Sequence, residues 1–258
     1  MTYMPRVAAA TEAEWSDLAA ELDRWEETGR TARLWWRDDD AVAATPALDR
    51  LLGLAHGIPL GLAVIPEPAE PALAERLAGE PLIAVLQHGW RHADHAAAGK
   101  KSEYPLERDA GEVAAELAVG QRRLATMFGA RALPVLVPPW NRFADRFVPL
   151  LAEIGIAAIS QQAPRTAAPS GVAAIDVHLD VTAWHTGRGF VGTGAALGRL
   201  IVELQARRMT GDGTAIGVLT HHLVMDMATE AFLARLGGAV ERHPAARWCA
   251  ISDLMAAP

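Results

Sequence analysis

The sequence predicts an α/β domain whose parallel sheet closes, or nearly closes, into a barrel. Apolar runs of strand length alternate with amphipathic stretches of helical period almost throughout the chain, which is typical of parallel strands joined by helices. About eight such strands in 258 residues fit a single barrel domain spanning residues 1–258. No glycine-rich phosphate loop follows any predicted strand, so a dinucleotide-binding sheet lacks its signature.

Apolar spacing and turn residues indicate the individual elements. Leu18 and Leu22 repeat at helical spacing in the opening segment, and Pro46 suits the first turn of the second helix. The expected elements are, in order, helix 15–29, strand 34–36, helix 45–57, strand 60–65, helix 71–77, strand 82–86, helix 112–128, strand 133–137, helix 146–154, strand 156–159, strand 173–181, helix 196–207, strand 215–219, helix 230–242 and strand 247–251. The long polar stretch 93–108 has the length of a functional lid.

Composition limits the class of protein and its partners. The net charge of −7 argues against nucleic acid or an anionic membrane surface as the main partner. Cys249 is the single cysteine, so neither an internal disulfide nor a thiolate metal cage is available, and we expect it to be buried. Because no leader pattern and no apolar run of about 18 residues occurs, a soluble cytoplasmic protein is expected. The oligomeric state is not indicated.

Two polar clusters directly follow predicted strands and suit a divalent metal. Asp38, Asp39 and Asp40 follow the first strand. Crowded carboxylates repel one another, and a bound metal relieves this, although a solvated turn is the alternative interpretation. In an extended chain, Asp38 and Asp40 share one side and Asp39 points to the other. His88 and His92 are four apart, so they face the same way on one helical turn, and their place after a strand favours metal ligands over a surface pair.

Other predicted strands also end in polar or aromatic residues, and this end of an α/β barrel holds the active site. Pro138 and Pro139 form a rigid segment that either ends a strand or presents Trp140 and a backbone N–H to a substrate. His221 is either a general acid or a further metal ligand, and His222 beside it is the alternative for both roles.

Two further residues follow the long strand 173–181 or lie in it. Asp180 either orients a catalytic histidine or Arg142, or caps the next element. Trp184, four residues later, has the flat face that stacks on a sugar or acyl group.

These clusters, in this order, resemble the motifs of the polysaccharide deacetylase family, also called carbohydrate esterase family four, with its NodB-homology domain. The segments that carry the resemblance are 37–41, 88–92, 138–141 and 219–221, and more faintly Asp180 with Trp184. The resemblance implies a distorted (β/α) barrel with fewer than eight regular units. It also implies that Asp40, His88 and His92 hold a divalent metal, with zinc as the first candidate.

Catalytic and binding roles follow from the same resemblance. Asp39 is implied as the general base and His221 as the general acid. Trp140, Asn141 and Trp184 are implied as substrate-binding residues, with support from Arg37, Arg142 and Asp180.

Two departures from the family pattern indicate an outlying branch. Gly89 stands where the family usually has a Ser or Thr that steadies the second motif. The Arg that normally precedes the proline motif is missing around Val137, and Arg37 or Arg142 is a candidate to stand in for it.

The leading hypothesis is a metal-dependent hydrolase that removes an N-acetyl or related acyl group from an amino-sugar-type or other small substrate. A second enzymatic hypothesis is hydrolysis of another amide, such as a cyclic ureide, on the same scaffold. A third is a non-catalytic relative that binds a metal or carbohydrate, which the altered third motif favours and the retained Asp39 and His221 oppose.

Overall fold

The computed structural model describes residues 12–163 and 171–255. Strands and helices alternate along this part of the chain. The strands are β1 (Ala32–Ala41), β2 (Leu60–Val64), β3 (Ile83–His88), β4 (Ala132–Val137), β5 (Ala158–Ile159), β6 (Ala173–Ala174), β7 (Leu179–Asp180), β8 (Ile216–Thr220) and β9 (Ala246–Trp248). The α-helices are α1 (Trp15–Glu27), α2 (Pro46–Leu54), α3 (Pro71–Leu77), α4 (Ala110–Phe128), α5 (Val148–Glu153), α6 (Thr193–Thr210), α7 (Met227–Arg242) and α8 (Ile251–Met255).

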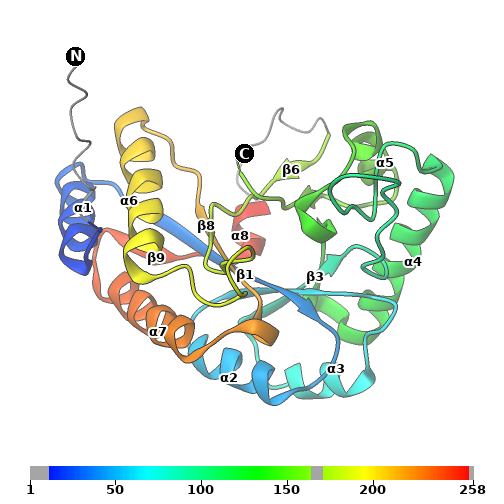
Figure 1. Cartoon of the computed structure of the whole chain (residues 1–258), viewed down its shortest axis with the longest axis horizontal. Helices are drawn as coiled ribbons and strands as arrows, with labels where there is room; N and C mark the ends of the chain where they lie inside the picture. The colour runs from blue at the N-terminus through cyan, green and yellow to red at the C-terminus, as the bar shows by residue number, and fades with distance from the viewer. Residues whose placement is uncertain (1–11, 164–170, 256–258) are drawn as a thin grey trace, which may run out of the picture.

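The strands form one curled parallel sheet in the order β6-β5-β4-β3-β2-β1-β8-β7, and β9 pairs with the first residues of β1. The larger helices lie around the outside of this sheet (Figure 1). The predicted α/β barrel is therefore confirmed, as a curled sheet that is nearly closed.

The strand expected over 173–181 is wrong as a single element. Residues 173–174 pair with β5, whereas residues 179–180 pair with β8. The segment between them crosses from one edge of the sheet to the other, with Val177 N–H bonded to the Gln161 carbonyl and His178 N–H to the Gly217 carbonyl. One stretch of chain thus links both edges and nearly closes the barrel.

Two separate apolar layers lie on the two faces of the sheet. Leu34 and Trp36 of β1 pack with the outer helices, whereas Trp35 packs inside the barrel with residues such as Leu86 and Val177. This alternation follows from the two-residue period of a strand. It places Arg37 and Asp39 on the same face as Trp35.

Three further expectations on local structure need correction. β1 extends through the acidic triplet to Ala41, since these carboxylates find partners inside the fold. The last strand ends at Trp248, and Ile251 begins α8, a short helix that packs into the barrel interior. The stretch 93–108 is not simply an exposed lid, because Ser102, Glu103 and Tyr104 in its middle are buried.

Two simpler expectations concern Cys249 and membrane spans. Cys249 is free and buried, as expected for a small hydrophobic residue. No helix among the described residues is both long and apolar enough to cross a membrane.

Candidate metal centre

The three aspartates at the end of β1 point to three different partners. Asp38 accepts hydrogen bonds from the Thr220 hydroxyl at 2.6 Å and pairs with His222 Nδ1 at 2.5 Å. Asp39 pairs with Arg37 on the inner face. Asp40 has a φ of +74°, which breaks the strand alternation and turns its carboxylate to the histidines of the next motif. The expectation that Asp38 and Asp40 share one side is therefore wrong.

Asp40, His88 and His92 bring one ligand atom each to a common point. Asp40 Oδ1 lies 3.1 Å from His88 Nε2 and 3.4 Å from His92 Nε2, and the candidate ligand atoms all lie within 4.8 Å of one another. The two rings converge without the expected helical turn. β3 ends at His88, and the backbone then turns back through positive φ at Gly89 (+60°) and His92 (+58°).

The donor set and its surroundings fit a divalent cation. His88 Nδ1 donates to the Val137 carbonyl at 2.9 Å, so in a neutral His88 the ring's free lone pair is on Nε2, the nitrogen that faces Asp40 and the candidate site. Metal-binding histidines usually have such a carbonyl partner on the other ring nitrogen. Burial raises the pKa of Asp40, but the hydrogen bond and charge of His88, together with His221 and His92, outweigh it and lower the pKa overall. The carboxylate is therefore ionised and available as a ligand.

Arg37 holds the Asp39 carboxylate from inside the barrel. Its side chain is fully buried, with Nε 2.9 Å from Asp39 Oδ1 and Nη2 donating to Oδ2 at 3.0 Å. Nη1 donates to the carbonyl and hydroxyl of Ser160, and Nη2 also donates to Asn141 Oδ1 at 2.7 Å. Of the two arginines considered as stand-ins for the missing family Arg, only Arg37 reaches Asp39, because Arg142 instead donates to the Lys101 carbonyl in an exposed position.

His221 lies on the other side of Asp39. Its Nε2 is 3.9 Å from Asp39 Oδ2, and its ring meets Trp184 edge to face with centroids 4.6 Å apart. Asp180 accepts a hydrogen bond from Trp184 Nε1 at 2.8 Å, so it orients this tryptophan and not a histidine or Arg142. His222 points away to Asp38 and is 1 % exposed. Geometry therefore selects His221 over His222 as the histidine that faces the site.

The proline segment supplies one wall of the site. Trp140 packs against His92 with ring centroids 4.3 Å apart. Trp140 and Asn141 both have positive φ, +55° and +56°, which forms the tight turn after Pro139. Asn141 is implied by the resemblance as a substrate-binding residue, and its amide oxygen accepts a hydrogen bond from Arg37 Nη2.

Glu103 is a buried residue of this region that the sequence did not indicate. Its carboxylate accepts the backbone N–H groups of Arg91 at 2.8 Å and Trp90 at 3.2 Å, between the two histidines. Burial raises its pKa, although these N–H groups oppose the rise. Glu103 lies in a polar stretch beside Lys100 and Lys101, and no local pattern distinguishes it from the exposed acids nearby.

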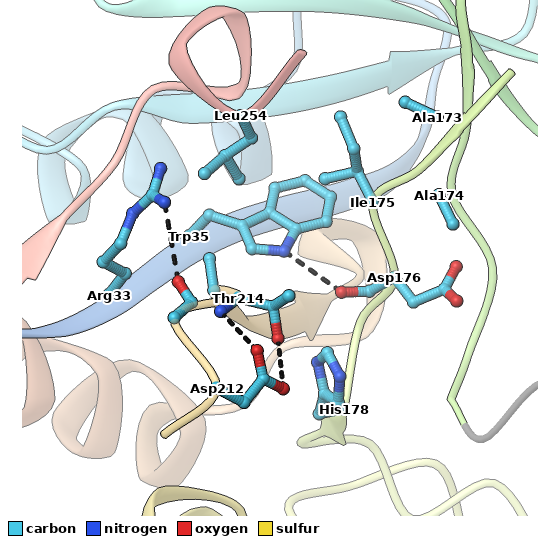
Figure 2. Close-up of a pocket in the computed structure, with 12 residues that line it drawn as sticks. Arg33, Trp35, Ala173, Ala174, Ile175, Asp176, His178, Asp212, Thr214 and Leu254 are labelled. Atoms are coloured by element: carbon cyan, nitrogen blue, oxygen red, sulfur yellow. Dashed lines mark hydrogen bonds between the residues drawn. The ribbon is translucent and has the colours of Figure 1, made fainter. Parts of the chain in front are cut away.

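A cavity of about 630 Å³ lies at the other end of the strands (Figure 2). Arg33 and Trp35 of β1 line it, with Asp176 and His178 on the crossing segment. Trp35, the nearer of the two β1 residues, is five positions before Asp40, so the cavity lining and the candidate ligand are roughly 15 Å apart along the strand. The cavity is therefore separate from the histidine cluster.

Comparison with known proteins shows the fold. Searches with family models and against curated proteins give no match. Among solved structures, a candidate polysaccharide deacetylase from Mycobacterium smegmatis matches with a TM-score of 0.68 and 18% identity, over 96% of this chain and 93% of that one.

Two other solved structures match over most of this chain. A family 4 acetyl xylan esterase from Clostridium thermocellum, in complex with a cobalt ion, matches with a TM-score of 0.54 and 12% identity over 86% of this chain and 89% of its own. A mutant of a pseudoenzyme of the same family, with restored activity, matches with a TM-score of 0.57 and 14% identity over 88% and 68%. The chain thus has the fold of family 4 carbohydrate esterases, and the resemblance seen in its motifs is confirmed at this level.

Proposed function

We propose that this chain is a metal-dependent hydrolase that removes an N-acetyl or related acyl group from an amino-sugar-type substrate. The observation that carries the proposal is the convergence of Asp40, His88 and His92 on one point beside Asp39 and His221. One carboxylate and two imidazoles leave coordination positions open, as catalytic zinc sites require.

A divalent cation held by these three residues would supply a water of lowered pKa and polarise the carbonyl of the acyl group. Asp39 is the proposed general base and takes a proton from the attacking water. Arg37 fixes its carboxylate through both oxygens, each of which keeps a second lone pair for that proton. His221, on the other side of Asp39, is the proposed general acid and protonates the leaving amine through Nε2.

Two tryptophans are placed to bind the substrate. Trp140 packs on His92, and Trp184 packs on His221 with its indole N–H fixed by Asp180. Trp184 is 40% exposed, so part of its surface remains open to a sugar ring. A small or carbohydrate acetamido compound is the substrate class that this arrangement favours.

Metal removal tests the proposal directly. Treatment with a chelator should abolish release of acetate from N-acetylglucosamine oligomers and from small acetamides, and zinc should restore it. Activity that is indifferent to both treatments would contradict a metal mechanism. Ring opening of a cyclic ureide in the same assay, without acetate release, would favour the second hydrolase hypothesis.

Asp39→Asn separates the proposed base from the metal ligands. We expect the variant to bind zinc with the affinity of the parent chain and to lose turnover by at least about 100-fold, the usual contribution of acid–base catalysis. Loss of zinc binding as well would reassign Asp39 to the ligand set. Equal binding and no turnover in both chains would support a non-catalytic relative.

A further inference from the structure

The turn between the two histidines is held almost entirely by its backbone groups. The Gly89 N–H donates to the Val137 carbonyl at 3.1 Å, and the Gly89 carbonyl accepts from Gln87 Nε2 at 3.1 Å. The next two N–H groups, of Trp90 and Arg91, both donate to the carboxylate of Glu103. The Trp90 carbonyl also accepts from the Glu67 N–H at 2.9 Å. Among the side chains that contact this turn, Glu103, 11 residues beyond His92, accepts two successive N–H groups between the histidines and so helps to set the position of His92 relative to His88.

Glu103 and a side chain at position 89 exclude each other. A Cβ built on Gly89 would lie 1.9 Å from Glu103 Oε2 and 2.7 Å from Pro139 Cδ. No rotation of a larger residue relieves this, since a Cβ is fixed by the backbone. Glycine at position 89 thus leaves room for the Glu103 carboxylate. A Ser or Thr at this position, as is usual in the family, would occupy the space that Glu103 fills here.

The hydrogen bonds that the Glu103 carboxylate accepts from Trp90 and Arg91 both go to the turn between the histidines. Glu103 is 0 % exposed, and the ion pairs among the described residues do not include it. A buried carboxylate without a cation costs several kcal/mol unless it accepts strong hydrogen bonds. The hydrogen bonds of Glu103 go to the turn that carries His92. They offset the cost of burying the carboxylate only while that turn keeps its conformation.

We infer that Glu103 is the positioning residue of the metal centre, replacing the Ser or Thr side chain that usually steadies this motif. The inference rests on the proposed function, because it concerns how His88 and His92 are presented to the cation. Outer residues that orient metal ligands typically contribute 10- to 100-fold in metal affinity.

Glu103→Gln tests the inference with almost no change in volume. The amide oxygen can still accept one N–H, but the amide NH₂ faces the other N–H without an acceptor. We expect the zinc Kd of the full chain, measured by competition with a chromophoric chelator, to rise about 10- to 100-fold. With cobalt, the visible absorption bands should also shift, since they report ligand geometry and not overall stability.

Glu107→Gln is the matched control, because Glu107 is an exposed glutamate of the same loop. Its Kd and cobalt spectrum should match the parent. If E103Q does not fold, Glu103→Asp keeps the charge on a shorter side chain and should also weaken zinc binding at least tenfold. A folded E103Q or E103D with a Kd within twofold of the parent overturns this inference alone. Absence of zinc binding by the unaltered chain overturns the metal centre and the inference together.

Discussion

Arg37→Lys tests how the proposed base is held. Arg37 makes five polar contacts inside the barrel, to Asp39, Ser160 and Asn141. Lysine keeps the charge but has one nitrogen with three N–H donors, so it cannot reproduce the two-pronged contact with Asp39. The exchange therefore removes the two-pronged arrangement of N–H donors, but it leaves a positive charge beside the buried Asp39 carboxylate.

The structure sets the size of the effect. At least two of the five contacts of Arg37 must be lost, and a hydrogen bond involving a charged group contributes about 1.5 to 3 kcal/mol. The free energy of unfolding should therefore fall by about 3 to 6 kcal/mol. For a chain of this size, that corresponds to a decrease in Tm of about 6 to 24 °C.

Thermal unfolding followed by circular dichroism measures this loss, and Arg142→Lys is the control. Arg142 is a partly exposed arginine of the same region that donates to the Lys101 carbonyl, so its exchange should change Tm by no more than about 1 °C. Turnover by R37K should fall at least tenfold while the zinc Kd stays unchanged, because Arg37 contacts Asp39 and not the ligands. A variant with the Tm and turnover of the parent would refute the account of Arg37.

Two further predictions concern buried pairs away from the ligands. Asp38→Ala leaves His222 buried without its partner and should lower the free energy of unfolding, measured in urea, by about 3 kcal/mol. The control Asp23→Ala removes an exposed partner of His243 and should change this free energy by less than about 0.5 kcal/mol. Equal effects of the two variants would contradict the role of burial. Burial and then the charge of Arg207 lower the pKa of His178 to about 4, so the folded protein resists a proton that the unfolded chain binds from about pH 6.5 downward. Stability should therefore decrease as the pH falls from about 6.5 to 4, by up to about 3 kcal/mol, and His178→Gln should flatten this dependence in urea titrations at pH 7.5 and 4.5; an unchanged slope would exclude His178 as its source.

The sequence was sufficient for the features that depend on local patterns. Alternating apolar runs indicate the parallel sheet, and the polar residues after those runs indicate which end carries chemistry. His88 and His221 lie where strand ends predicted them. The two-residue period of β1 also places Arg37 beside Asp39, although the sequence alone left Arg37 and Arg142 equivalent.

What the sequence did not indicate depends on backbone torsion and on long-range contact. Positive φ at Asp40 and His92 cannot be derived from a strand or helix period, and it is this torsion that turns both side chains to one point. Glu103 lies in a stretch that is as polar as any exposed loop. Its buried carboxylate accepts two N–H groups of the turn after β3, a long-range contact that no local pattern indicates.

The two departures from the family motifs are connected by the same physical reasoning. In each case a fully buried ionisable side chain, Arg37 or Glu103, contacts the motif that lacks its usual residue. Burying such groups costs several kcal/mol before their contacts are counted, so a barrel selected for stability alone would be better served by apolar residues there. The contacts of Arg37 end on Asp39, and those of Glu103 end on the turn that carries His92. The cost of burying Arg37 and Glu103 is thus offset by contacts at the end of the sheet where hydrolysis is proposed. This favours a catalytic centre with changed supporting residues over a non-catalytic relative.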